Sequence, residues 1–228
     1  MELYQDNPIQ ENSVSLNSVL ANTFFRMFLG LLASAISAFF VYYTGMYEKL
    51  LQGSGYLVLA IAEIVIVLLF SFLFKKLSPT AVTILYFAYA FLNGFTLSVL
   101  LLIYEISSVV YAFVATAAVF GVLAYIGKTT NKDLTKFGTF LIVALIIGLV
   151  VTIINLFVGS TLLDIGLNWA ILFIFFGLTI YDTNKIKRMY EEGFVESEKL
   201  YIYGAMELYL DFINIFLRIL RLLGKRRS

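Results

Sequence analysis

Seven long apolar stretches dominate this chain and leave only short polar connections between them. Their ranges are 21–43, 56–74, 81–103, 107–126, 139–158, 167–188 and 199–223. A helix of about 20 apolar residues crosses the hydrocarbon core of a bilayer, and each stretch is close to that length or longer. Hydrophobic residues make up 61% of the chain, far more than a soluble domain of 228 residues carries. The sequence therefore predicts an all-α, multi-pass protein of the cell membrane.

We expect one seven-helix domain, residues 21–224, with a polar tail on either side. Residues 1–20 contain no Lys or Arg and lack the basic start and cleavage site of a signal peptide, so they predict a disordered tail. Residues 225–228 form a short basic tail. Ser78 followed by Pro79 is typical of an N-cap and first helical turn, which predicts that the third helix begins there.

The Lys and Arg residues are unevenly divided among the connections. Nine of them lie in or beside the second, fourth and sixth connections, whereas the alternate connections contain only Lys49. Cytoplasmic loops carry the excess of basic residues, so we expect a cytoplasmic N-terminus. The basic residues 225–227 would then lie outside, against this bias. The sequence leaves open whether the last stretch crosses or turns back.

Several classes of function lack the residues that they need. The chain contains no Cys and no His, which excludes disulfides, thiolate or imidazole metal sites and His-based triads. It has no Gly-rich phosphate loop with a Lys. A net charge of +1 gives no basic footprint for nucleic acid. We expect a protein that is not an enzyme, has no cofactor and does not bind nucleic acid.

The last stretch carries its polar residues on one side. At about 100° per residue they fall within a sector of roughly 100°. These residues are Gly204, Glu207, Asp211, Asn214, Arg218, Arg221 and Lys225. A carboxylate such as Asp211 is costly inside a membrane unless it faces a protein interior or a water-filled cavity. This polar stripe therefore predicts partners or a pathway beside the last helix.

Besides Asp211, two acidic residues, Asp182 and Glu63, lie at membrane depth. Asp182 in the sixth stretch and Asp211 in the seventh are placed at similar depth by the 1.5 Å rise per residue. If they meet, burial and like charge favour one shared proton, and the pair titrates as one unit. Alternatively, each pairs separately with a base, Asp182 with Lys185. Glu63, about 10 Å into the second helix, is either part of a cation pathway or a hydrogen-bonded core carboxyl.

At these same residues the chain resembles a known family. Residues 181–186 (YDTNKI), residues 207–216 (ELYLDFINIF) and the ending at Gly224 are similar to the two C-terminal signatures of the Bax-inhibitor family, the transmembrane Bax inhibitor motif proteins. Glu63, Asn93-Gly94 and the seven-helix layout extend the resemblance over about residues 20–224, and the short tails look like a bacterial member. The resemblance implies six helices wrapped around a central C-terminal helix. It also implies a pH-sensitive calcium leak, with Ca²⁺ as the permeant ion, gated by Asp182 and Asp211.

The resemblance suggests further site residues. Some relatives have a latch in which a basic residue at the inner end of the second helix bonds the aspartate of the sixth. Here Lys75 and Lys76 stand in place of an arginine, and a lysine is a point donor that would make a looser latch. Glu207, Asn214 and Glu63 are candidates for the cation pathway. Weak, transient binding of Ca²⁺ by oxygen ligands, including Asp182 and Asp211, is what conduction requires.

Other classes share some of these features. A proton-coupled cation exchanger and a non-conducting scaffold are both compatible with the sequence. An intramembrane aspartyl protease also places Tyr-Asp on one helix and Asp on the next. Residues 208–210 are Leu-Tyr-Leu where that class has glycines, however, and the only prolines are Pro8 and Pro79, so its later proline motif is absent.

Overall fold

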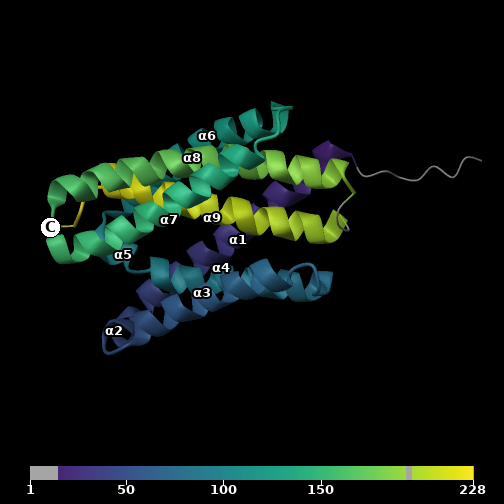
Figure 1. The fold of residues 1–228 in the computed structure, drawn as a ribbon. Helices are drawn as coiled ribbons and strands as arrows, with labels where there is room; N and C mark the ends of the chain where they lie inside the picture. Colours follow the sequence, from purple (N-terminus) through teal and green to yellow (C-terminus); the bar gives the residue numbers. More distant parts are fainter. Residues whose placement is uncertain (1–14, 194–196, 228) are drawn as a thin grey trace, which may run out of the picture.

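The computed structural model describes residues 15–193 and 197–227, which form a helical bundle (Figure 1). Its helices are α1 Leu16–Tyr43, α2 Met46–Leu51, α3 Gly55–Leu73, α4 Pro79–Leu97, α5 Leu100–Ile103, α6 Ile106–Thr129, α7 Thr135–Val158, α8 Thr161–Glu191 and α9 Ser197–Leu223. Seven helical segments, counting α4 and α5 together, are long and apolar enough to cross a membrane. The predicted all-α fold with seven spans is confirmed.

The C-terminal helix lies at the centre of the bundle. In Figure 1, α9 runs between α8 and the pair α3 and α4, and it packs against α1, α4, α6 and α8. In the apolar part of α9, 72% of the residues are buried, against 6% in α3. The predicted central position of this helix is confirmed. The helices α3 and α7 are peripheral and pack mainly on α4 and α8, respectively.

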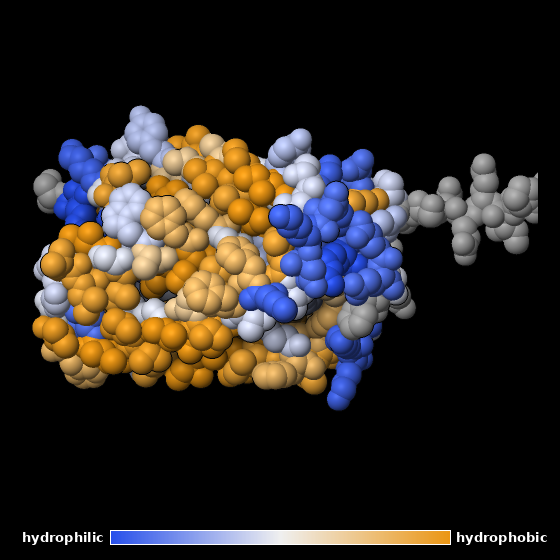
Figure 2. Space-filling view, turned by 45° about the horizontal axis from the view of Figure 1, so that its top comes forward, coloured by the Kyte–Doolittle hydropathy of each residue, from blue (hydrophilic) through white to orange (hydrophobic). Residues whose placement is uncertain are grey.

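On the face shown in Figure 2, a broad hydrophobic band lies between two more hydrophilic ends. The peripheral helices carry large exposed apolar side chains, such as Phe72 on α3 and Phe157 on α7. Exposed apolar surface of this kind is stable where lipid covers it. Because helices satisfy their backbone hydrogen bonds internally, a bundle of this kind can sit in hydrocarbon.

Several helix boundaries differ from prediction. The helices α7 and α8 begin at Thr135 and Thr161 instead of residues 139 and 167, and α8 is capped by the Ser160 hydroxyl, which accepts a hydrogen bond from the Leu163 amide at 3.3 Å. The first helix begins at Leu16 instead of residue 21, because Ser15 caps it by accepting a hydrogen bond from the Ser18 amide at 3.2 Å. Val19 and Leu20 are buried there, so part of the predicted tail is helix, and residues 1–14 lie outside the described residues. The third predicted stretch is interrupted between α4 and α5, where the Ser98 hydroxyl donates to the Phe95 carbonyl at 2.6 Å.

The start of α4 is as predicted. Pro79 occupies its first turn, and the Ser78 hydroxyl accepts a hydrogen bond from the Ala81 amide at 3.2 Å. The cap replaces one of the missing backbone acceptors at the helix start, and the proline needs none. The connection between α3 and α4 is therefore short and sharply defined.

The last helix passes through the whole bundle. It begins at the end that holds the α3–α4 and α6–α7 connections, which we call the inner end after its basic loops, and finishes at the opposite, outer end (Figure 1). Residues 225–227 of the predicted C-terminal tail are attached there. Glu105 N donates to the Lys225 carbonyl at 3.0 Å, and Arg227 N donates to the Ile103 carbonyl at 2.9 Å. The turning-back alternative is therefore wrong, whereas the membrane side that each end meets stays a prediction.

Candidate functional site

The polar stripe of α9 faces α8. The two helices run antiparallel, so increasing residue numbers on α9 lie opposite decreasing residue numbers on α8. Four pairs of side chains lie opposite one another: Lys185 and Glu207, Asp182 and Asp211, Asn168 and Arg218, and Asp164 and Arg221. We call these eight residues the polar seam. The sequence predicted that the stripe would face partners, and α8 supplies them.

Both ends of the polar seam join complementary groups. At the outer end, Arg221 Nη2 lies 2.6 Å from each carboxylate oxygen of Asp164. Next to it, Arg218 Nη1 donates to Asn168 Oδ1 at 3.4 Å, and Asn168 Nδ2 donates to the Arg218 carbonyl at 3.2 Å. At the inner end, Lys185 Nζ lies 3.8 Å from Glu207 Oε1. Arg218 and Arg221 thus attach α9 to α8 at the outer end.

The middle of the seam is different. Asp182 and Asp211 are 6% and 3% exposed, and their carboxyl groups lie within hydrogen-bonding reach of each other. The hydroxyl of Thr179, one turn from Asp182 on α8, lies beside Asp211. Asp211 Oδ2 is buried with no hydrogen-bond donor among residues 15–193 and 197–227. A contact between two carboxyls becomes a hydrogen bond only when one of them carries a proton.

Aromatic rings surround the basic residue next to this pair. Lys185 Nζ lies 5.0 Å from the centroid of the Tyr203 ring and 5.8 Å from that of Tyr181. The Tyr203 ring packs against Phe74 of the α3 inner end, with 4.6 Å between centroids. Ring faces and the Glu207 carboxylate together balance the lysine charge. Sequence analysis missed Tyr203, although it lies one turn before Glu207 on the same face of α9.

The expected latch is not among the contacts of Asp182 that the structure describes. The charged side chains that interact electrostatically with the Asp182 carboxyl are Glu207 and Lys185. Lys75 and Lys76 are exposed where α3 ends. The basic residue that acts on Asp182 is therefore Lys185 of the same helix. A latch from Lys75 or Lys76 stays a prediction.

Glu63 belongs to a second polar cluster. Its carboxylate accepts hydrogen bonds from Asn93 Nδ2 at 3.2 Å and from Thr96 Oγ1 at 2.6 Å. The Tyr209 hydroxyl donates to Asn93 Oδ1 at 3.0 Å and also contacts Ser34 Oγ at 2.7 Å. These contacts connect α1, α3, α4 and α9. The Glu63 carboxyl is thus hydrogen-bonded and half-buried, and its place in a cation pathway stays a prediction.

Helix geometry separates this cluster from the seam. Tyr209 and Asp211 are two residues apart on α9, which places their side chains about 200° apart around the helix. Glu63 also lines a cavity of about 300 Å³ together with Tyr89, on the outside of α3 and α4. A role for Glu63 in a cation pathway would therefore need a path on the opposite side of α9 from Asp211.

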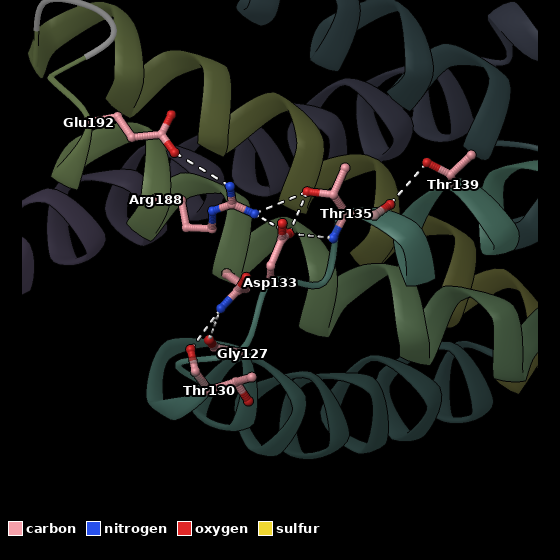
Figure 3. Close-up of polar contacts among 8 residues, drawn as sticks. Gly127, Thr130, Asp133, Thr135, Thr139, Arg188 and Glu192 are labelled. Atoms are coloured by element: carbon pink, nitrogen blue, oxygen red, sulfur yellow. Dashed lines mark hydrogen bonds and ion pairs between the residues drawn. The ribbon is translucent and has the colours of Figure 1, made fainter.

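The connection between α6 and α7 holds α8 from the other side (Figure 3). Asn184, two residues after Asp182, donates to the Thr130 carbonyl at 2.7 Å. Arg188 forms an ion pair with Asp133 and donates to Thr135 Oγ1 at 3.0 Å. Hydrogen bonds from Thr135, with the nearby Arg188 charge, lower the pKa of Asp133. The inner half of α8 is thus anchored to the α6–α7 connection. The spacing of residues in the sequence did not predict this contact.

The candidate ligands for Ca²⁺ are few. In the part of the chain that the structure describes, no group of three or more acidic, His or Cys residues could hold a metal ion. Asn214 Nδ2 donates to the carbonyl of Leu210 on its own helix at 2.8 Å, which leaves its side-chain oxygen for other contacts. Strong Ca²⁺ sites use about six to eight oxygens. Binding of Ca²⁺ by Asp182 and Asp211 stays a prediction.

Comparison with known proteins identifies the family. The family described as "Inhibitor of apoptosis-promoting Bax1" matches residues 16–228. The chain belongs to the Bax inhibitor family. Among its relatives is the inner membrane protein YbhL of Escherichia coli K12, which is 34% identical over 98% of both chains. An uncharacterized protein of Deinococcus radiodurans is 36% identical over 95% of this chain and 94% of its own.

An uncharacterized membrane protein of Streptococcus pyogenes serotype M3 is 34% identical over 94% of this chain and 96% of its own. These Bax inhibitor relatives match over nearly their whole length. The resemblance seen in residues 181–186 and 207–216 is therefore confirmed, and it extends over all seven spans.

Proposed function

We propose that this protein is a pH-sensitive calcium leak channel, in which Ca²⁺ moves passively across the membrane and protonation of Asp182 and Asp211 gates the path. One observation carries the proposal. Within the polar seam, Asp182 and Asp211 are the one pair that places two acidic groups opposite each other, and both are buried. Membrane-buried carboxyls are costly, and proton relays and ion paths are where they are found.

The charge state of this pair controls how α8 meets α9. With one proton present, the two carboxyls share a hydrogen bond across the helix contact. With both ionised, two unit charges about 4 Å apart repel by about 4 kcal/mol at an effective dielectric constant of about 20. The complementary pairs Lys185–Glu207 and Asp164–Arg221 hold the helices together on either side. Repulsion then separates the middle of the seam, and packed helices respond by switching between discrete arrangements.

The same face of α9 supplies oxygens for a passing cation. Glu207 and Asn214 lie one turn on either side of Asp211. Carboxylate and amide oxygens suit Ca²⁺, and a sparse set of them binds weakly enough for the ion to leave. Glu207 also neutralises Lys185, which would otherwise repel a cation at this position. A latch from Lys75 or Lys76 at the inner end would restrain the closed arrangement. Glu63 would lie on a separate branch of the path that does not carry the pH response.

The placement in the cell membrane is part of the proposal. The basic connections favour a cytoplasmic N-terminus. With seven crossings, residues 225–227 would then lie outside. The printed name of the relative YbhL describes an inner membrane protein. The calcium path would then run between the two sides through the α8–α9 contact.

Calcium flux in liposomes that contain only this protein tests the proposal. The vesicles hold a calcium indicator and a pH indicator, and Ca²⁺ is added outside. For the wild type, we expect Ca²⁺ to enter down its gradient with no matching proton exit. In vesicles with the double variant D182A/D211A, Ca²⁺ should enter no faster than in protein-free vesicles. Stoichiometric proton exit would instead indicate a cation exchanger. Absence of entry at every pH would favour a non-conducting scaffold, and either result would overturn the leak.

A further inference from the structure

A second site lies at the outer end, away from the carboxyl pair. A cavity of about 570 Å³ opens between α5 and the last turns of α9. Three arginines line it: Arg218 and Arg221 on α9, and Arg226 on the C-terminal segment. The rest of its wall consists mostly of apolar side chains of α5 and α9. This cavity therefore combines a concentrated positive charge with an apolar wall.

The positive charge in this cavity is incompletely balanced. Arg221 has a carboxylate partner in Asp164, with both oxygens 2.6 Å from Nη2. Arg218 contacts only the neutral oxygen of Asn168 at 3.4 Å, and its Nε is buried without an acceptor among the described residues. Arg226 is exposed and is fixed through its backbone by an antiparallel bridge to Tyr104. Guanidinium groups around one cavity repel one another unless an anion lies between them.

We propose that this cavity binds a phosphate group through Arg218, Arg221 and Arg226. Guanidinium groups present a planar fork of donors that matches the oxygens of a phosphate. The group could come from inorganic phosphate or from the headgroup of a phospholipid, because the cavity lies at the end of a membrane span beside an apolar wall. A bound phosphate also explains why three arginines gather at the end where the basic-loop rule predicts few.

The ligand would join two separate parts of the chain. Arg218 and Arg221 belong to the central helix, whereas Arg226 follows it in the segment that pairs with residues 103–105. That segment is also held by Lys225, whose Nζ lies 2.7 Å from Glu105 Oε1. Phosphate binding would therefore fasten the C-terminal segment over the outer end of α9.

Titration of inorganic phosphate into the purified full-length protein in a non-ionic detergent tests this site. The heat of binding is compared for the wild type, R226Q and the matched control R227Q. The R227Q variant removes the same charge one residue later in the chain. The Arg227 guanidinium does not line the cavity, because it donates to the Tyr42 hydroxyl at 2.7 Å and to the Leu101 carbonyl at 3.0 Å. We expect R226Q to weaken binding at least about tenfold and R227Q to change it less than about threefold.

A second arm distinguishes the source of the phosphate. The same proteins are placed in lipid discs of phosphatidylglycerol or of a phosphate-free glycolipid, and the lipids retained after extraction are counted by native mass spectrometry. Retention of one phosphatidylglycerol by the wild type and R227Q, but not by R226Q, would assign the site to a headgroup. If R226K, which keeps the charge without the fork, binds as weakly as R226Q, the fork geometry is supported. Equal behaviour of R226Q and R227Q in both arms would overturn the proposal.

Discussion

Substitution of Gly94 by alanine should separate α4 from α1 and destabilise the bundle. Gly94 faces Ser34 and Ser37 across this contact. A Cβ atom at residue 94 would overlap Ser37 Oγ and the Ser34 carbonyl oxygen, and it would lie 2.9 Å from the Ser34 carbonyl carbon. Because two of these atoms belong to the backbone, the helices themselves must move apart. Glycines at such contacts allow helices in membranes to approach closely.

The expected cost follows from two effects of this separation. Overpacking a tight contact by one methyl group costs about 1–3 kcal/mol. The separation also weakens two hydrogen bonds, from Ser34 Oγ to the Ala90 carbonyl at 2.6 Å and from Ser37 Oγ to the Phe91 carbonyl at 2.9 Å. Each is worth about 0.6 kcal/mol between membrane helices. The gain of about 1 kcal/mol from replacing glycine by alanine within a helix opposes them. The net loss should be about 1–3 kcal/mol.

Unfolding of the purified protein in mixed detergent micelles, with increasing SDS and helix content as the signal, measures this loss. The matched control is Gly121→Ala on α6, where an added Cβ meets no atom within 4 Å. The control should be as stable as the wild type, or more stable by up to about 1 kcal/mol. Equal midpoints for the two variants would refute the steric argument and the α1–α4 distance that it depends on.

Three further predictions concern other parts of the molecule. Tyr209→Phe should lower the unfolding free energy by about 1–3 kcal/mol, because it removes the contacts with Ser34 and Asn93 and leaves a buried amide oxygen unpaired; the same SDS titration measures it, and an unchanged midpoint would contradict it. A cysteine at Ser13 should be protected from an impermeant thiol reagent in intact cells and one at Gln52 should react, whereas the reverse pattern would invert the proposed orientation. The lowered pKa of Asp133 means that its stabilising contacts are fully present above the ordinary value of about 3.9 and are lost as pH falls through the lower folded value. Amide exchange at residues 131–135 should therefore increase in acid beyond the intrinsic rate, and Asp133→Asn should remove that extra increase.

Sequence patterns predicted the spans and the face of α9 correctly, since both depend on local periodicity. The start of α1 was harder to predict, because polar residues such as Asn17, Ser18 and Asn22 obscure the apolar pattern there. Hydrogen bonding decides the boundary: Ser15 caps the helix, and Asn22 Nδ2 donates back to the Ser18 carbonyl at 2.9 Å. The break between α4 and α5 has a similar origin in one serine hydroxyl.

The partners of the polar residues required the structure. Spacing places Glu207 and Asp211 on one face of α9, but it does not reveal which helix lies opposite. Glu63 has a comparable position within the membrane, yet helix packing assigns it to the cluster of Asn93 and Tyr209 on the other side of α9. Asn184 looked like one more polar residue of a signature, whereas its hydrogen bond to the α6–α7 connection depends on a contact between distant parts of the chain.

The pH profile of calcium entry into proteoliposomes tests the central proposal most directly. Initial rates are measured from about pH 6 to pH 8 for the wild type, Asp182→Asn, Asp211→Asn and the double variant, with Glu63→Gln as the control, because two carboxyls that share one proton titrate as a unit. We predict that either single Asp→Asn variant loses the pH dependence, that the double variant changes little further, and that Glu63→Gln keeps the wild-type profile. A wild-type profile in Asp182→Asn together with a flat profile in Glu63→Gln would contradict the account and place the pH sensor in the Glu63 cluster.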